Sequence, residues 1–138
     1  VLADAAMLAE QLGAKLILFR AVALPMHLPA QALAMPPADV AGLLSQLARK
    51  QLEELGRAVP EALIERIQVE LGTAWRCVCD TARADAADLV VIGSHSYGGV
   101  DRLLGTTAAK IVDHAPCSIY VVRRRSSATD RHRAEAAT

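Results

Sequence analysis

Four short aliphatic runs, separated by segments with helical spacing, constrain the fold of this chain more than any other feature. The runs are AKLILFRAVAL (14–24), RIQVEL (66–71), ADLVVIG (87–93) and CSIYVVRR (117–124). Continuous apolar strands are typical of parallel sheets covered on both faces, whereas a strand with one face in water alternates between apolar and polar residues. The runs at 14–24 and 87–93 therefore predict buried strands, and those at 66–71 and 117–124 predict two further strands.

The segments before and between these runs carry helical signals. Apolar residues recur at helical spacing in 1–13, 39–59, 74–84 and 106–115. We expect Gly13 to stop the first helix, Asp39 and Thr73 to cap the second and third, and Pro60 and Pro116 to end the second and fourth. The faces that we expect to be buried comprise Leu2, Ala5, Ala6, Ala9 and Leu12 in the first helix and Val40, Leu43, Leu44, Leu47 and Leu55 in the second.

Alternating helices and strands predict an α/β fold, with a doubly wound parallel sheet and helices on both faces. Ligands of such sheets bind beyond the carboxyl ends of the strands. We expect one domain over residues 1–123, with a proline-rich flap at 25–38. The residues after Arg123, RRSSATDRHRAEAAT (124–138), have no apolar face, so we expect a disordered polar tail.

Composition narrows the class of protein. The 138 residues include fifteen basic and fifteen acidic side chains, and this balance gives no overall field that would attract nucleic acid or a membrane surface. No apolar run approaches the ~18 residues of a membrane-spanning helix. The three cysteines are sparse and odd in number, which favours a reducing compartment over a disulfide scaffold. We expect a soluble cytoplasmic domain.

The glycine-rich stretch IGSHSYGGVDRLLGTT (92–107) follows the third run and admits two interpretations. It is either a cradle for phosphate or only the turn that leads a strand into a helix. For a cradle, a glycine allows close backbone approach, and a helix N-terminus offers unpaired N–H groups to an anion. For a turn, the stretch lacks the lysine of a P-loop. The candidate phosphate-binding residues are Gly93, Ser94, His95, Ser96, Gly105, Thr106 and Thr107.

The segment DLVVIGSHSYGGVDRLLGTTAAKIVDHAPCSIYVVR (88–123) resembles the C-terminal half of the universal stress protein family, as does VELGTAWRCVCDTARADAADLVVIG (69–93) before it. The resemblance implies a five-stranded sheet of order 3-2-1-4-5 and, in one branch of the family, bound ATP. It also implies a homodimer joined through the last strand, here Ser118, Ile119, Tyr120, Val121 and Val122.

The nucleotide motif of the ATP-binding branch is Gly-x2-Gly-x9-Gly-Ser/Thr. Gly93 matches its first glycine, but Ser96 stands at the second, and the loop to Gly105 and Thr106 is one residue short. A subgroup with Gly-Ser-His and this shorter loop includes ATP-binding members. The resemblance therefore implies ATP with Mg²⁺, the ion held through the nucleotide and Thr106. The strand end at Ala21, Val22 and Ala23 would offer its backbone to the adenine.

Members of the family begin with a strand reading roughly Ile-Leu-Val-Ala-x-Asp-x-Ser, whereas this sequence starts within the first helix. We therefore expect the first strand to be missing from the sequence. Either it lies upstream of Val1 or a segment of a partner chain takes its place. No residue here is assigned the role of that Asp.

The residues and the resemblance together leave three functions open. The first is a universal stress-type regulatory domain that binds ATP or a related adenine nucleotide as a homodimer. The second is a nucleotide-free dimer that acts through protein contacts, which Ser96 and the short loop favour. The third is a slow ATPase, for which only Asp101 or His95 is available as a general base. No catalytic triad or paired carboxylate motif is present in the sequence.

The remaining candidates have structural interpretations. Cys77 and Cys79 form C-x-C without further metal ligands nearby, so we expect buried thiols and no metal site built from side chains. Cys117 is assigned to the core or an interface. We expect Trp75 to pack, and His114 to sit at a helix C-terminus, where an imidazolium is favoured.

Overall fold

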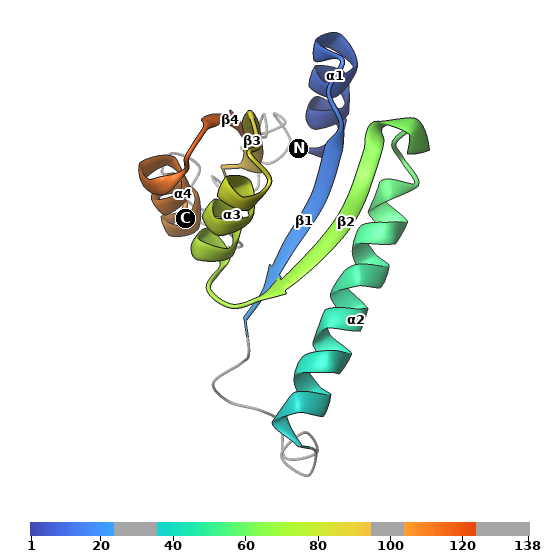
Figure 1. The fold of residues 1–138 in the computed structure, drawn as a ribbon, viewed down its shortest axis with the longest axis vertical. Helices are drawn as coiled ribbons and strands as arrows, with labels where there is room; N and C mark the ends of the chain where they lie inside the picture. Colours follow the sequence, from blue (N-terminus) through green and yellow to red (C-terminus); the bar gives the residue numbers. More distant parts are fainter. Residues whose placement is uncertain (24–35, 95–103, 124–138) are drawn as a thin grey trace, which may run out of the picture.

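The structure is a computed structural model that describes residues 1–23, 36–94 and 104–123. Helices and strands alternate along the chain as the sequence predicts (Figure 1). The predicted tail and most of the predicted flap lie outside the described residues. The elements are α1 (Leu2–Leu12), β1 (Leu16–Val22), α2 (Pro37–Gly56), the 3-10 helix η2 (Glu61–Leu63), β2 (Ile64–Leu71), α3 (Ala74–Ala84), β3 (Leu89–Gly93), α4 (Thr106–His114) and β4 (Ser118–Val122).

The strands form two parallel pairs. β1 pairs with β2, ending at the register Val22 with Leu71, and β3 pairs with β4 from Leu89 with Ser118 to Gly93 with Val122. Within the described residues each strand has hydrogen bonds to one neighbour only. The parallel α/β arrangement is confirmed. The five-stranded order 3-2-1-4-5 counts the expected missing strand as strand 1, so that β1 to β4 are strands 2 to 5, and this order stays a prediction.

The helix α2 runs along β1 and β2, and α3 lies beside α4 (Figure 1). On α2 the buried side chains are Val40, Ala48 and Leu52, spaced four or eight residues apart along one face. Gly56 continues that row, and a Cβ there would lie 3.2 Å from Leu18 Cδ1 of β1. Small residues at 48 and 56 thus bring the helix close to the sheet.

The predicted buried faces are partly wrong. Leu43, Leu47 and Leu55 of α2 are exposed, because the face centred on Ala48 and Leu52 meets the strands instead. In α1, Ala5 and Ala9 are buried as expected, but Leu12 in the last turn is exposed.

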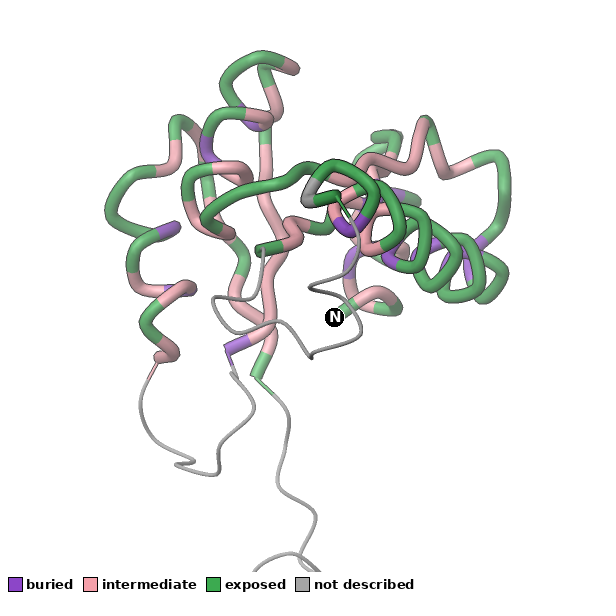
Figure 2. The backbone as a smooth tube through the Cα atoms, turned by 90° about the horizontal axis from the view of Figure 1, so that it is seen from below, coloured by how far each residue is buried: buried purple, intermediate pink, exposed green. Residues whose placement is uncertain are grey.

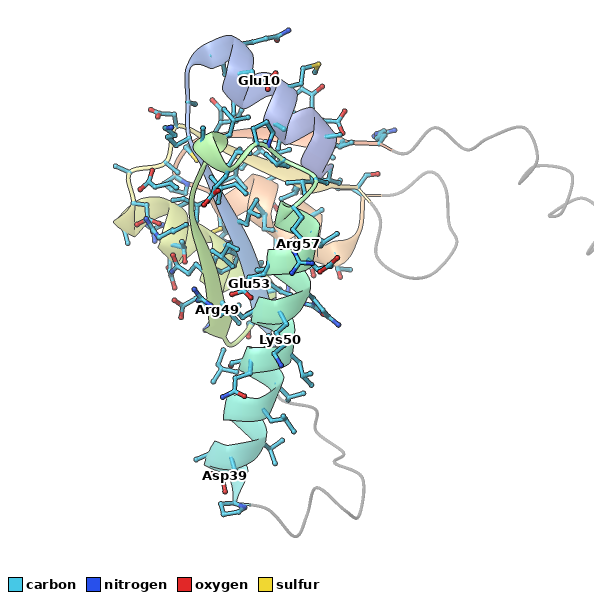
Figure 3. All side chains as sticks on the ribbon, turned by 90° about the vertical axis from the view of Figure 1, so that its right-hand side faces the viewer. Glu10, Asp39, Arg49, Lys50, Glu53 and Arg57 are labelled. Atoms are coloured by element: carbon cyan, nitrogen blue, oxygen red, sulfur yellow. The ribbon has the colours of Figure 1, made fainter. Side chains whose placement is uncertain are left out.

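The core of the described chain is made mainly of small aliphatic residues. No large side chain in this part of the molecule is fully buried, and most of the backbone is half-buried or exposed (Figure 2). The exposed face of α2 carries ion pairs between Arg49 and Glu53 at 3.2 Å and between Arg57 and Glu54 at 2.8 Å (Figure 3). None of the helices in the described ranges is long and apolar enough to cross a membrane.

The helix ends show which capping signals act. Gly13 has φ 64° and its N–H donates to carbonyls of α1, as its assignment as a stop predicts. The assignment of Asp39 as a cap is wrong, because α2 begins at Pro37, with Pro36 at the N-cap. Proline suits the first turn of a helix, because its fixed φ is helical and the N–H that it lacks would have no partner within the helix there. Thr73 occupies the N-cap of α3 without a side-chain hydrogen bond, and α2 ends at Gly56, before Pro60.

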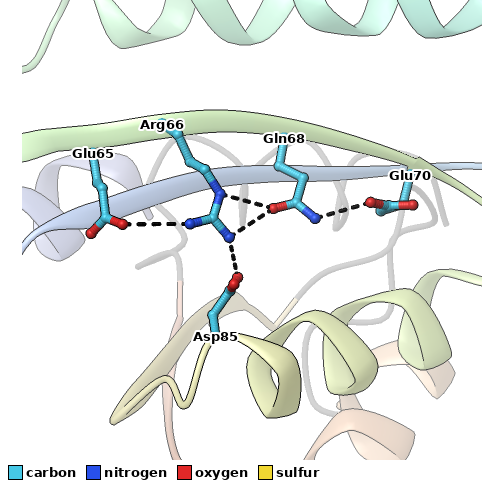
Figure 4. A network of polar contacts seen from close by, with 5 residues as sticks. All are labelled: Glu65, Arg66, Gln68, Glu70 and Asp85. Carbon is cyan, nitrogen blue, oxygen red and sulfur yellow. Dashed lines mark hydrogen bonds and ion pairs between the residues drawn. The ribbon is translucent and has the colours of Figure 1, made fainter.

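A chain of polar contacts joins β2 to the end of α3 (Figure 4). The Arg66 guanidinium donates to Gln68 at 3.1 Å and pairs with Asp85, the residue that follows α3. Gln68 Nε2 then donates to Glu70 at 2.9 Å. The hydrogen bond to Asp85 raises the pKa of Arg66 above its usual value. The network thus links β2 to the residue that follows α3.

Candidate functional site

The end of β3 meets the start of α4 through backbone hydrogen bonds. Ser94, which follows Gly93, donates its N–H to the Val122 carbonyl at 2.9 Å, and so ties this end to β4. Its carbonyl accepts the Gly105 N–H at 3.3 Å. Ser94 is buried, with 6% of its surface exposed. We call Gly93, Ser94, Gly105, Thr106 and Thr107 the β3–α4 junction.

The junction presents the N-terminus of α4. Ala109 N–H donates to the Gly105 carbonyl at 2.9 Å, so the N–H groups of Thr106, Thr107 and Ala108 precede the first hydrogen bond of the helix. The N-cap of α4 has no side-chain hydrogen bond. Thr106 is exposed and Thr107 is half-buried. The geometry offers backbone donors and the positive end of a helix dipole in one place.

The two glycines of the junction differ in whether glycine is needed there. A Cβ at Gly93 would lie 3.1 Å from Val1 Cγ2, so the backbone is closely approached there. Gly105 has φ −57° and ψ 151°, a conformation open to any residue. Glycine at 105 is therefore not required by the backbone, and its effect on a ligand would come from the missing side chain.

The predicted adenine-side residues lie at the end of β1. Ala21 and Val22 are half-buried and Ala23 is exposed. The Val22 carbonyl accepts the Gly72 N–H at 2.9 Å, which joins the carboxyl ends of β1 and β2. One lone pair of that carbonyl is thus already used within the protein.

Sequence reasoning missed the importance of Gly72. It has φ 148°, and a Cβ there would lie 2.9 Å from Cys77 Sγ. The sequence does contain a signal for it, because a glycine between a strand and a helix cap is typical of a backbone conformation that other residues rarely adopt.

The described residues hold only part of the predicted phosphate site. Gly93, Ser94, Gly105, Thr106 and Thr107 come together at the junction. His95 and Ser96 lie outside the described residues, as does Asp101.

The predicted dimer strand β4 is paired with β3 on one side. Ser118 and Tyr120 are exposed, and Tyr120 is 42% exposed. Ile119, Val121 and Val122 are half-buried. The exposed aromatic ring and alternating burial are compatible with a contact surface, but dimerisation stays a prediction.

The three cysteines are free thiols. Cys79 is buried, as expected, whereas Cys77 and Cys117 are half-buried. Burial raises the pKa of all three thiols above the ordinary value, which disfavours the reactive thiolate form. Among the described residues no group of three His, Cys, Asp or Glu side chains could hold a metal ion.

The helices α3 and α4 also share an aromatic contact. The rings of Trp75 and His114 lie 4.8 Å apart between centroids. His114, the last residue of α4, donates its Nδ1–H to the Lys110 carbonyl at 2.9 Å. Trp75 does pack between helices as predicted, and His114 does satisfy a carbonyl in the last turn of its helix.

Comparison with known proteins places this arrangement in a family. A family model described as the universal stress protein family matches residues 1–123. The chain belongs to this family. Two curated universal stress proteins of Coxiella burnetii (strain RSA 493 / Nine Mile phase I) are similar to it, the A homolog 2 at 29% identity over 89 residues and the A homolog 1 at 36% over 75. These matches cover 64% and 54% of this chain but only 60% and 51% of the relatives' lengths.

Solved structures share the fold. The universal stress protein UspA from Lactobacillus plantarum superposes with a TM-score of 0.71 at 23% identity, covering 88% of this chain and 86% of the other. The hypothetical protein MJ0577 superposes with a TM-score of 0.70 at 15% identity, covering 91% of this chain and 90% of the other. At these identities the likeness concerns the fold.

Proposed function

We propose that this universal stress protein domain is a regulatory module that binds ATP or a related adenine nucleotide with Mg²⁺ and works as a cytoplasmic homodimer. The observation that carries the proposal is the β3–α4 junction, where the end of β3, followed by the buried Ser94, meets a helix N-terminus whose N-cap residue makes no side-chain hydrogen bond. This is the arrangement that favours a phosphate group.

The junction supplies donors for phosphate oxygens. The N–H groups of Thr106, Thr107 and Ala108 precede the helical ladder, and the threonine hydroxyls add further donors. Each charge–dipole contact contributes only about 0.3–1 kcal/mol when exposed, so binding requires several of them together. Mg²⁺ would be held by the phosphates and the Thr106 hydroxyl, since hard oxygen ligands suit this ion.

We place the adenine at the end of β1. Ala21, Val22 and Ala23 would face it with backbone groups, in the way that the resemblance implies. The nucleotide would shift a population of conformations rather than turn over rapidly, because ligands act through differential affinity for two states. A slow ATPase activity has no acid or base to support it at the described part of the junction.

The sheet arrangement is part of the proposal. A strand between β1 and β3 would join the two parallel pairs into the order 3-2-1-4-5, because each described strand lacks a second neighbour. β4 would then form an outer edge that is free for dimerisation through Ser118–Val122.

The alternative is a nucleotide-free dimer that acts through protein contacts. Ser96 in place of the family glycine favours it, as does the involvement of Ser94 in backbone bonds that close the strand end. The two functions differ in whether the junction takes up a phosphate at all.

Calorimetric titration with ATP, with and without Mg²⁺, tests the proposal on the chain extended at its N-terminus by a strand of the family pattern. We expect micromolar binding that falls by about tenfold or more in Gly105→Val and Ser96→Asp, because a side chain or a carboxylate would then face the phosphates. The matched control is Gly42→Ala on α2, where an added Cβ meets nothing within 4 Å. A folded dimer that gives no heat with millimolar ATP would refute nucleotide binding and favour the alternative.

A further inference from the structure

A basic and aromatic surface spans α3 and α4 and is made of residues that do not belong to the β3–α4 junction. The Arg76 guanidinium carbon lies 5.2 Å from the centroid of the Trp75 ring, and Lys110 Nζ lies 5.9 Å from it. The His114 ring packs on the same indole at 4.8 Å. We call Trp75, Arg76, Lys110 and His114 the Trp75 patch. Cations within about 6 Å of an aromatic ring are attracted to its face, so the indole holds these charges together.

The cations of this patch form no ion pair within the described part of the chain. In the described ranges Arg49, Arg57, Arg66 and Arg83 form ion pairs with carboxylates. Arg76 and Lys110 form none, as is also true of Lys15, Arg20, Lys50 and Arg123. Asp113, three residues after Lys110, makes no ion pair with it. Arg76, Lys110 and His114 are exposed, and Trp75 is half-buried. The patch therefore presents a local excess of positive charge around a partly accessible indole.

This composition suits protein recognition. Tryptophan and arginine are the residues that most often dominate binding energy at protein interfaces. Arginine pairs with carboxylates through two parallel hydrogen bonds, and the contact with Trp75 restricts its guanidinium before any partner arrives, so less side-chain entropy remains to be lost on binding.

We propose that the Trp75 patch is a docking surface for an acidic segment of a partner protein. Carboxylates of that segment would pair with Arg76 and Lys110, and an apolar side chain beside them would cover Trp75. This inference does not depend on nucleotide binding, because none of these residues belongs to the junction.

A short acidic segment fits better than a nucleic acid strand. The positive charge is confined to one place, since Asp80, one turn further along α3, is exposed and pairs with Arg83 at 3.1 Å. A polyphosphate backbone that followed the helix would meet that carboxylate.

Tryptophan fluorescence tests the proposal at a single site, because Trp75 is the only tryptophan of the chain. The 138-residue chain is titrated at low ionic strength with poly-L-glutamate and, separately, with a single-stranded oligothymidylate. We expect poly-L-glutamate to give a saturable change in emission. The apparent dissociation constant should rise about threefold or more in each of Arg76→Gln and Lys110→Gln.

The matched control is Lys50→Gln, which removes an exposed lysine of α2 that also has no ion pair in the described part of the chain. Lys50→Gln should bind as the unchanged protein does, and circular dichroism should show that all three variants keep their helices. The proposal is overturned if poly-L-glutamate leaves the emission unchanged, if Lys50→Gln weakens binding as much as Arg76→Gln, or if oligothymidylate binds more tightly than poly-L-glutamate.

Discussion

At the scale of single residues, Gly72 has the conformation least open to substitution. Its φ of 148° disfavours any residue with a side chain, and an added Cβ would lie 2.9 Å from Cys77 Sγ. We expect Gly72→Ala to lower the free energy of unfolding by about 1–3 kcal/mol. Gly42→Ala, in the interior of α2 with open space around it, should raise it by about 0.5–1 kcal/mol.

Urea denaturation of the two glycine variants measures both effects under one condition. The opposite signs make the pair informative, since each change adds the same methyl group. Equal stability of the two variants would contradict the role assigned to the β2–α3 turn.

The cysteines lead to a prediction of how the stability of the protein depends on pH. Burial raises the pKa of Cys77, Cys79 and Cys117 in the folded state, so the folded protein holds these protons more tightly than the unfolded chain does. The stability that results is fully present below the pKa of ~8.5 of the thiols in the unfolded chain. It is lost as the pH rises through their higher pKa values in the folded state.

The free energy of unfolding should therefore fall as the pH rises above ~8.5, and this fall should diminish in Cys79→Ala. Denaturation in urea at several alkaline pH values measures it. Alkylation by iodoacetamide should reach Cys79 last, because only 3% of its surface is exposed. Rapid modification of Cys79 in the native protein would contradict its burial.

Among secondary-structure elements, α2 shows how far a hydrophobic pattern determines packing. Leu52 is 9% exposed and faces the strands, whereas Leu55 is 57% exposed on another side of the helix. We expect Leu52→Ala to cost about 2–5 kcal/mol of stability and Leu55→Ala to stay within about 0.5 kcal/mol. Thermal unfolding of the two variants compares the same deletion on two faces, and equal losses would place the buried face of α2 elsewhere.

The sequence could identify α2 but not its buried face. Its leucines satisfy helical spacing on more than one side of the helix. The side that packs is decided by Ala48 and Gly56, whose small size allows the helix to lie close to the sheet. The existence of the strands was easier to predict, because β1 and β3 are aliphatic runs between helix stops. The start of α2 was misjudged, since Pro36 and Pro37 replace a side-chain cap.

At the scale of the whole molecule, the alternation of helices and strands determines the fold class, and the family model over residues 1–123 agrees with it. In the structure the Ser94 carbonyl accepts the Gly105 N–H, so Gly93 and the start of α4 lie close together, while their role as a phosphate site stays a prediction. What the pattern could not supply was the Trp75 patch. Its members come from α3 and α4, and their meeting depends on how two helices pack rather than on local spacing.

The pairing of the strands leads to the last prediction. A strand edge inside the molecule leaves N–H and C=O groups unpaired, and such groups cost free energy when they are removed from water. β1 and β3 each have one partner in the described residues, and we propose that a strand between them pairs with both. The alternate amides of β1 and β3 that point away from β2 and β4 should then exchange slowly with solvent once that strand is present.

Amide hydrogen exchange compares the 138-residue chain with a chain extended by a strand of the family pattern Ile-Leu-Val-Ala-x-Asp-x-Ser. Protection should rise on β1 and β3 and change little on β2 and β4, which serve as the internal control. Because alternate residues of a parallel strand bond to opposite neighbours, a uniform rise over all four strands would reflect general stabilisation rather than insertion. No rise on β1 and β3 would contradict the order 3-2-1-4-5 for this chain, and with it the position of the adenine at the end of β1.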